Sequence, residues 1–148
     1  MSHRLPMLLF VADDDADDRL LIRDAFLETS DSLRLTFFES GDAMMSGLQD
    51  ASARQALPKL ILLDLNMPGK SGRDIIAEIK TDPTLRGIPV VVLTTSRDEK
   101  DIADCYQLGA SSYIVKPVSY EELLEIARSV TNYWTRTTVL PGQSTHYV

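Results

Sequence analysis

Side chains that could carry out phosphoryl or metal chemistry follow several apolar runs of this sequence. Two acids come directly after residues 7–12, another acid ends the run 59–64, and a hydroxyl and an amine end the later runs; these residues are Asp13, Asp14, Asp64, Thr94 and Lys116. A carboxylate is costly to bury unless it is paired or bound to a cation, so the arrangement indicates a site. Asp64 alone has a simpler explanation, because Asp, Asn, Pro and Gly are common where a strand ends in a turn.

The acids together predict a magnesium ion and an aspartyl phosphate. Carboxylates that lie close together raise one another's pKa, and a hard divalent cation removes this repulsion. Mg²⁺ prefers oxygen ligands, and we expect Asp13, Asp14, Asp64 and the backbone carbonyl of Asn66 to hold it. An Asp carboxylate can also attack phosphorus and carry the phosphoryl group, which is the role predicted for Asp64.

The amine and the hydroxyl fit the same reaction. A phosphoryl group in transfer requires positive charge and hydrogen-bond donors. Lys116 would neutralise the phosphoryl oxygens, and Thr94 would donate its hydroxyl to one of them. These roles explain why Asp64 stands at the end of a buried strand, since its carboxylate would be the reactive group.

The elements that must position these residues alternate between strand and helix. Continuous apolar runs predict strands, and stretches with apolar residues on one face predict helices between and after them. The strands are expected at 7–12, 34–39, 59–64, 88–95 and 112–116, and the helices at 18–29, 42–50, 73–80, 96–108 and from 119 onward. This pattern predicts an α/β fold, a parallel sheet with helices on both faces, whose ligands bind beyond the carboxyl ends of the strands. Capping boxes are expected at Ser96 with Glu99 and at Ser119 with Glu122.

Four motifs in order resemble two-component response-regulator receiver domains. They are VADDD, LLDLNMPGKSG, VVVLTTS and YIVKP, and the resemblance extends from residue 7 to about 134. It implies a flavodoxin-like fold with strand order 2-1-3-4-5, and a histidine kinase or histidine phosphotransfer protein as the phosphoryl donor. It also implies that the receiver catalyses its own phosphorylation and dephosphorylation, and that Thr94 and Tyr113 shift together as a switch.

The chain departs from the family pattern at two points. Thr95 stands where the family usually has a small residue, which would alter access to the phosphoryl pocket. The acids after the first strand form a triplet, and we assign the metal pair to Asp13 and Asp14. The stretches TDPTLRGIPVVVLTTS and YWTRTTVLP are similar to stand-alone receivers of the bacterial phytochrome-associated kind. We therefore expect a tail at 1–6, a receiver domain at 7–134, and an extension at 135–148 with no separate output domain.

Other interpretations of the acidic residues remain open. Asp17 and Asp18 are most simply the solvated first turn of a helix, where Asp is favoured. A calcium loop fails because Asp18 occupies the position of its glycine and Asp24 that of its final glutamate. The remaining alternatives are an aspartate-nucleophile phosphatase, whose DxDx[TV] motif is only half matched, and a receiver-like binding module that takes no phosphate.

Composition narrows the class of partner. The chain has 148 residues and a formal net charge of -7, which disfavours direct binding to nucleic acid or to an anionic membrane surface. No apolar run approaches the length of a transmembrane helix, and the single cysteine, Cys105, permits no internal disulfide. We expect a cytoplasmic protein that signals to an unidentified protein partner and forms a homodimer through its fourth and fifth helices and the 135–148 segment.

Overall fold

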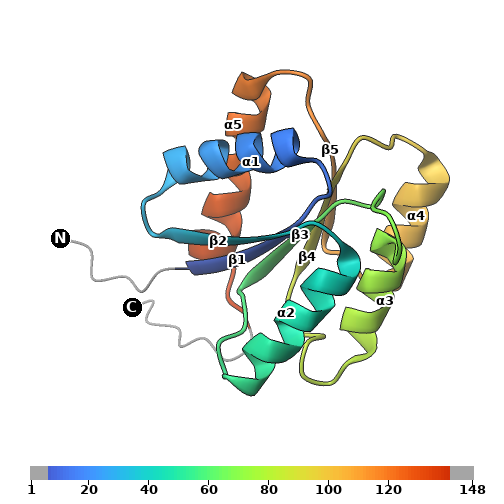
Figure 1. Cartoon of the computed structure of the whole chain (residues 1–148). Coiled ribbons are helices and arrows are strands. Elements are labelled where there is room, and N and C mark those ends of the chain that lie inside the picture. The colour runs from blue at the N-terminus through green and yellow to red at the C-terminus, as the bar shows by residue number, and fades with distance from the viewer. Residues whose placement is uncertain (1–6, 141–148) are drawn as a thin grey trace.

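The computed structural model describes residues 7–140 and places a five-stranded parallel sheet at the centre of the molecule (Figure 1). The strand order is β2-β1-β3-β4-β5, which confirms the order implied by the family resemblance. The strands are β1 (Met7–Ala12), β2 (Leu33–Phe38), β3 (Leu60–Leu63), β4 (Val90–Thr94) and β5 (Ser112–Val115). Because β1 lies between β2 and β3, its carboxyl end lies between the carboxyl ends of these two strands.

Helices cover both faces of the sheet, as the alternating pattern predicts. They are α1 (Ala16–Thr29), α2 (Gly41–Ala53), α3 (Gly72–Thr81), α4 (Glu99–Leu108) and α5 (Tyr120–Asn132). Helices α1 and α5 pack against each other on one face, while α2, α3 and α4 lie side by side on the other (Figure 1). Each parallel strand is therefore shielded from water on two sides, which explains why the central strands are apolar at successive positions.

Two apolar clusters, one on each face, hold the layers together. In β1, Phe10 faces the α2–α3–α4 side, and Leu9 and Val11 face the α1–α5 side, because successive side chains of a strand point in opposite directions. Ile76 of α3 and Phe26 of α1 are fully buried in the respective clusters. The burial of large side chains on both faces fixes the register of β1 and β3.

The helix ends show which capping predictions hold. Ser119 caps α5 by accepting a hydrogen bond from the backbone N–H of Glu122 at 3.1 Å, which confirms the N-cap residue and one half of the predicted capping box. The prediction that Ser96 caps α4 is wrong: Asp98 is the N-cap residue, and its side chain accepts from the N–H of Lys100. Ser96 instead donates its hydroxyl to Asp101 at 2.6 Å, because its place in the β4–α4 loop precedes the helix by three residues.

The described chain stays helical for a few residues past 134, where the receiver domain is predicted to end. Helix α5 continues into a short π-helix, η1 (Tyr133–Thr137), so helical backbone enters the segment predicted as an extension. The spacing of apolar residues predicts that Leu21 and Tyr133 face inward, but Leu21 of α1 is 44% exposed and Tyr133 is 51% exposed. The predicted tail at 1–6 and residues 141–148 of the predicted extension lie outside the described residues. Within residues 7–140, no helix has both the length and the apolar character that a membrane span requires.

Candidate functional site: an acidic pocket at the strand ends

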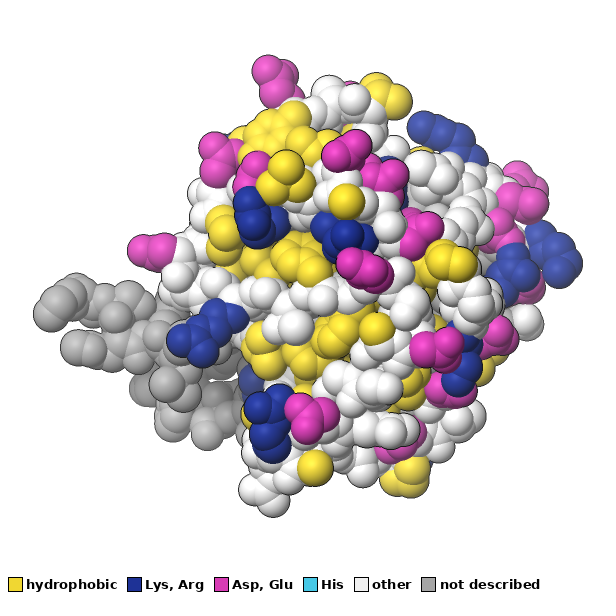
Figure 2. All heavy atoms as spheres, in the orientation of Figure 1, with side chains coloured by type: hydrophobic (Ala, Val, Ile, Leu, Met, Phe, Trp, Pro, Cys, Tyr) yellow, Lys and Arg dark blue, Asp and Glu magenta, His cyan; other side chains and the backbone are white. Residues whose placement is uncertain are grey.

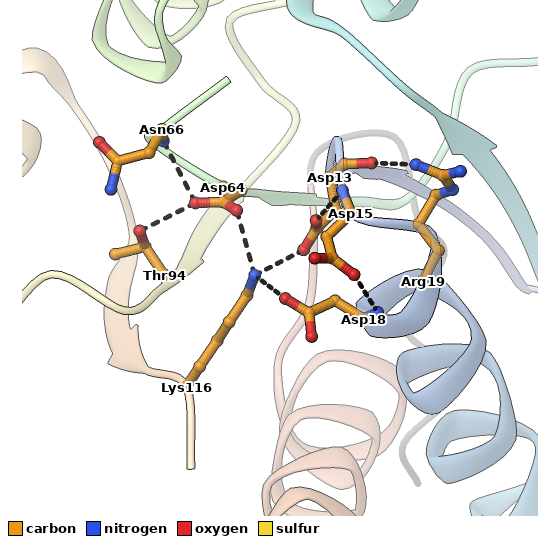
Figure 3. A network of polar contacts seen from close by, with 8 residues as sticks. All are labelled: Asp13, Asp15, Asp18, Arg19, Asp64, Asn66, Thr94 and Lys116. Carbon is orange, nitrogen blue, oxygen red and sulfur yellow. Dashed lines mark hydrogen bonds and ion pairs between the residues drawn. The ribbon is translucent and has the colours of Figure 1, made fainter. Parts of the chain in front are cut away.

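Backbone hydrogen bonds extend the sheet by one residue past β1, β3 and β5. The three side chains at these positions therefore lie at the same edge of the sheet. The N–H of Asp13 donates to the carbonyl of Phe38 at 3.0 Å, and the N–H of Asp64 donates to Ala12 at 3.0 Å. The N–H of Lys116 donates to the carbonyl of Thr94 at 2.7 Å. The order of the strands therefore brings together residues that lie more than a hundred positions apart in the chain (Figure 3).

Both carboxylate oxygens of Asp64 have partners. Oδ1 accepts hydrogen bonds from the Thr94 hydroxyl at 2.9 Å and from the backbone N–H of Asn66 at 3.2 Å. Oδ2 lies 3.1 Å from Nζ of Lys116. Asp64 is 7% exposed and Thr94 is fully buried, so the carboxylate is held in one orientation with an ammonium and a hydroxyl beside it. These are the donors that a phosphoryl group in transfer requires.

Asp13 is the most deeply buried acid of the site. Its Oδ1 accepts from the backbone N–H of Asp15 at 2.9 Å. Its Oδ2 lies 2.8 Å from Nζ of Lys116 as an ion pair, yet it is inaccessible to solvent and receives no well-aligned hydrogen bond. Burial raises the pKa of Asp13 above its ordinary value, and the contacts with Lys116 and Asp15 only partly offset that effect. A buried anionic oxygen without a well-aligned donor is suited to bind a cation.

The acids fit a hard divalent ion. One carboxylate oxygen from each of Asp13, Asp14 and Asp64 can be chosen so that all three lie within 4.8 Å of one another. Asp14 is exposed, unlike the other two, so an ion held here would keep contact with solvent. Asn66 reaches the site through its backbone N–H; ligation by its carbonyl stays a prediction, as does the assignment of the metal pair to Asp13 and Asp14.

Lys116 contacts three carboxylates at once. Its Nζ lies 2.8 Å from Asp13, 2.7 Å from Asp18 and 3.1 Å from Asp64 (Figure 3). Burial by itself would lower the pKa of Lys116, but the contacts of its ammonium with the carboxylates of Asp13 and Asp18 raise it above its ordinary value. Lys116 is therefore a permanent cation at neutral pH, next to the oxygen atoms of Asp64.

Sequence reasoning missed Asp18, which it treated as part of a solvated helix turn. Asp18 lies on α1 at i, with Ile22 at i+4 and Ala25 at i+7, and these two apolar residues are buried. Helical spacing therefore placed Asp18 on the face that packs on the sheet. Asp17, one position earlier, shares its face with exposed Leu21 and is itself exposed. Periodicity alone did not separate the two acids, because Leu21 is also apolar and only the structure shows that it is exposed.

Of the two predicted switch residues, Thr94 contacts Asp64, and Tyr113 contacts the loop that follows Thr94. Tyr113 is half-buried, and its hydroxyl donates to the carbonyl of Ser96 at 2.9 Å, two residues after Thr94. The hydroxyl of Ser96 donates to Asp101 on α4, and Asp101 forms an ion pair with Arg73 on α3. The loop that follows Thr94 is thus linked to β5, α4 and α3, although a joint movement of Thr94 and Tyr113 stays a prediction.

Known proteins resemble this chain over most of its length. Residues 9–128 match the response regulator receiver domain family. The chain is 37% identical over 138 residues to the response regulator Rcp1 of Synechocystis sp., an alignment that covers 92% of this chain and 93% of that protein. Its structure is similar to that of the phosphorylated cyanobacterial phytochrome response regulator RcpA, with a TM-score of 0.86, 37% identity, and coverage of 93% and 99% of the two chains. The Mn(2+)-bound form of response regulator Rcp1 matches with a TM-score of 0.82, 36% identity, and coverage of 93% and 100%.

Proposed function

We propose that this chain, which belongs to the response regulator receiver domain family, accepts a phosphoryl group on Asp64 and signals by protein–protein interaction. The observation that carries the proposal is the Asp64 carboxylate itself. It is buried, fixed between the Thr94 hydroxyl and the Lys116 ammonium, and adjacent to the acidic oxygens of Asp13 and Asp14. Such a group is placed to react with an anionic phosphorus compound.

In the proposed reaction, one carboxylate oxygen of Asp64 attacks the phosphorus atom of a phosphohistidine. A new O–P bond forms as the P–N bond breaks, and the leaving imidazole nitrogen keeps the electron pair and takes a proton. Lys116 neutralises the phosphoryl oxygens as they approach, and Thr94 donates its hydroxyl to one of them. Mg²⁺, held by Asp13, Asp14, Asp64 and the Asn66 carbonyl, would supply the remaining positive charge. We propose that the chain itself catalyses this transfer and the later hydrolysis.

The proposed phosphoryl donor is a histidine kinase or a histidine phosphotransfer protein. The similarity to RcpA, a cyanobacterial phytochrome response regulator, supports a kinase of the phytochrome kind. A pocket beside Lys116, lined in part by Leu21, Pro117 and Tyr120, offers apolar contact next to the site. Val118 at its rim is 99% exposed. Figure 2 shows exposed hydrophobic side chains (yellow) over the part of the surface where α1 and the start of α5 lie.

The proposed output is a change on the face that contains α4, β5 and α5. The contact from Tyr113 to Ser96 joins that face to the loop after Thr94 and supports this direction of signalling. We propose a cytoplasmic protein that forms a homodimer through α4 and α5 and passes its signal to a protein partner. Light scattering tests the dimer: a monomer at tens of micromolar, a concentration that would reveal moderate affinities, would contradict it.

Intact-protein mass spectrometry tests the phosphoacceptor proposal. The protein is incubated with acetyl phosphate, with and without Mg²⁺, beside Asp64→Asn and the matched control Asp31→Asn, which changes an exposed acid. We expect one added phosphoryl group in the wild type and in Asp31→Asn, dependent on Mg²⁺, and no adduct in Asp64→Asn. The absence of an adduct from the wild type, together with unchanged NMR spectra in beryllium fluoride and Mg²⁺, would favour a receiver-like module that takes no phosphate.

A further inference from the structure

One of the three carboxylates around Lys116 has no part in the proposed chemistry. Asp13 and Asp64 are needed for the metal ion and the phosphoryl group, but Asp18 is not. Asp18 nevertheless makes the shortest of the three contacts, 2.7 Å from its Oδ2 to Nζ of Lys116. We propose that Asp18 is a positioning residue that keeps the Lys116 ammonium beside Asp64 while the other two carboxylates are occupied. This inference rests on the proposed function.

The first turn of α1 holds Asp18 in a fixed place. The side chain of Asp15 caps the helix by accepting from the backbone N–H of Asp18 at 3.0 Å. The guanidinium of Arg19 donates to the backbone carbonyl of Asp13 at 2.8 Å, which ties the start of α1 to the end of β1. A carboxylate on this anchored turn can restrain Lys116, whose long side chain otherwise has many rotamers and loses about 2 kcal/mol of conformational freedom when ordered.

The hydrogen-bond capacity of the ammonium shows when this restraint matters. A lysine ammonium has three N–H donors, and here Nζ lies within 3.1 Å of oxygens from three carboxylates. When a metal ion and a phosphoryl group occupy the site, the oxygens of Asp13 and Asp64 are engaged elsewhere. Asp18 then remains as the anchor for one donor, and the other two donors of Lys116 are free to point toward the phosphoryl oxygens. The side chain of Asp18 is 36% exposed, so water can solvate the rest of its carboxylate. The contact with Lys116 therefore needs no further protein partner.

A simple charge effect would act in the opposite direction. Acetyl phosphate is an anion, and removing a carboxylate close to its binding site should speed its reaction by lowering the repulsion. Loss of an anchor should slow the reaction, because the ammonium would no longer be held where charge develops on the phosphoryl oxygens. The sign of the change in rate therefore separates the two effects.

The first experiment compares Asp18→Asn with Asp17→Asn, which removes the same charge from the same helix turn. Asp17 is exposed, and within the described residues its side chain forms no hydrogen bond or ion pair. The rate of phosphorylation is measured at saturating Mg²⁺ over a range of acetyl phosphate concentrations. We expect Asp18→Asn to lower the maximal rate about tenfold, as for the loss of one charge-assisted hydrogen bond, with no rise in the half-saturating concentration. Asp17→Asn should stay within about twofold of the wild type, and Asp18→Glu should recover part of the rate.

A maximal rate in Asp18→Asn that equals or exceeds the wild-type rate would overturn the inference. A tenfold loss in Asp17→Asn as well would also overturn it, because the effect would then come from the charge of the helix turn. Thermal unfolding of both variants shows whether the substitutions affect the fold equally, since both acids lie in the first turn of α1.

A second measurement needs neither metal nor phosphoryl donor. The ¹⁵N signal of the Lys116 ammonium is recorded by NMR and assigned with Lys116→Arg. We expect a protected signal in the wild type and in Asp17→Asn, and a shifted signal in Asp18→Asn, because the ammonium loses the shortest of its three contacts. An unchanged signal in Asp18→Asn would refute the anchoring role. If the wild type takes no phosphoryl group on Asp64, the proposed function fails, and this spectrum still decides whether Asp18 positions Lys116.

Discussion

The carboxylate of Asp13 is the least favourably placed charged group at the proposed site. It is 1% exposed, and burial raises its pKa above the ordinary value of 3.8. A carboxylate with a raised pKa in the folded state binds its proton more tightly there than in the unfolded chain. Its ionisation therefore costs stability as the pH rises from 3.8 through the raised pKa, and the full cost applies above that value. A bound cation would offset this cost.

Asp13→Asn should therefore stabilise the protein in the absence of divalent ions. We expect its thermal midpoint at neutral pH to exceed that of the wild type by about 3 °C, which corresponds to about 1 kcal/mol for a domain of this size. The difference should shrink as the pH falls through the raised pKa and vanish below 3.8, where Asp13 becomes protonated in both states. With Mg²⁺ at about 100 times its dissociation constant, the wild type should gain about 2.7 kcal/mol and become the more stable protein. A less stable Asp13→Asn at neutral pH without metal would contradict this account.

Lys116→Ala separates the role of the ammonium from that of the metal. Removing the cation leaves the carboxylates of Asp13 and Asp64 available, so Mg²⁺ should still bind, as measured by calorimetry. The response to phosphorylation should be lost, because no ammonium would contact the phosphoryl oxygens. NMR shifts at α4 and β5 in beryllium fluoride and Mg²⁺ report this response, and undiminished shifts in Lys116→Ala would remove Lys116 from the mechanism.

At the scale of single residues, the sequence predicted which side chains lie together where a reactive side chain directly follows a strand. Asp64, Thr94 and Lys116 could be placed together because parallel strands end at the same edge of a sheet. Asp18 could not be found in that way, since it belongs to a helix and its acidic neighbours also suit a helix N-terminus. The contact between Asp18 and Lys116 spans 98 positions of the chain, and only the folded structure reveals it.

Among the elements, the start of α3 packs directly on the backbone of Asp64 and Leu65. A Cβ added at Gly72 would lie 2.7 Å from the backbone carbonyl oxygen of Asp64 and 2.7 Å from Cα of Leu65. Both contacts are with backbone that cannot move aside, so only glycine allows α3 to begin here. Gly72 thus sets the distance between α3 and the loop that holds the phosphoacceptor.

Gly72→Ala should push α3 away from Asp64. We expect a loss of about 1–3 kcal/mol in unfolding free energy, typical of overpacking, together with weaker Mg²⁺ binding. Gly87→Ala is the matched control, because a Cβ there meets nothing within 4 Å. That variant should be neutral or more stable by up to about 1 kcal/mol, since alanine restricts the unfolded chain. Equal effects of the two substitutions in denaturant titrations would argue against close packing at Gly72.

Element types were easier to predict than element ends. The apolar runs placed every strand within two residues of its observed bounds, because buried parallel strands are continuously apolar. The cap of α4 was misassigned because Ser96 and Glu99 match a capping box in spacing alone. The Ser96 hydroxyl instead donates to Asp101 on α4, and the Ser96 carbonyl accepts from Tyr113 on β5; pattern reasoning along the chain does not include such contacts.

For the whole molecule, the question is how a change at the strand ends reaches a distant face. The contacts of Ser96 connect the site loop with Tyr113 on β5 and with Asp101 on α4, and Arg73 of α3 pairs with Asp101. Strand order was the feature that sequence pattern could not supply. An alternation of strands and helices is compatible with several orders, and the order 2-1-3-4-5 came from the family resemblance.

Tyr113→Phe should weaken this coupling without affecting the site. The substitution removes the hydroxyl that donates to Ser96 and leaves the ring in its packing position. We expect Mg²⁺ binding and phosphorylation of Asp64 to be unchanged, and the NMR shifts of α4 induced by beryllium fluoride to be reduced by about half. Tyr133→Phe, at an exposed position on η1, is the control and should respond like the wild type. Shifts of wild-type size in Tyr113→Phe would show that coupling follows another route.

The most direct test of the central claim is to locate the phosphoryl group. The protein is phosphorylated with acetyl phosphate and Mg²⁺, reduced with sodium borohydride, which converts an aspartyl phosphate to homoserine, and analysed by peptide mass spectrometry. The account predicts homoserine at position 64 alone. Homoserine at Asp13, Asp14 or another acid, or none at position 64 in protein whose intact mass shows the adduct, would contradict it.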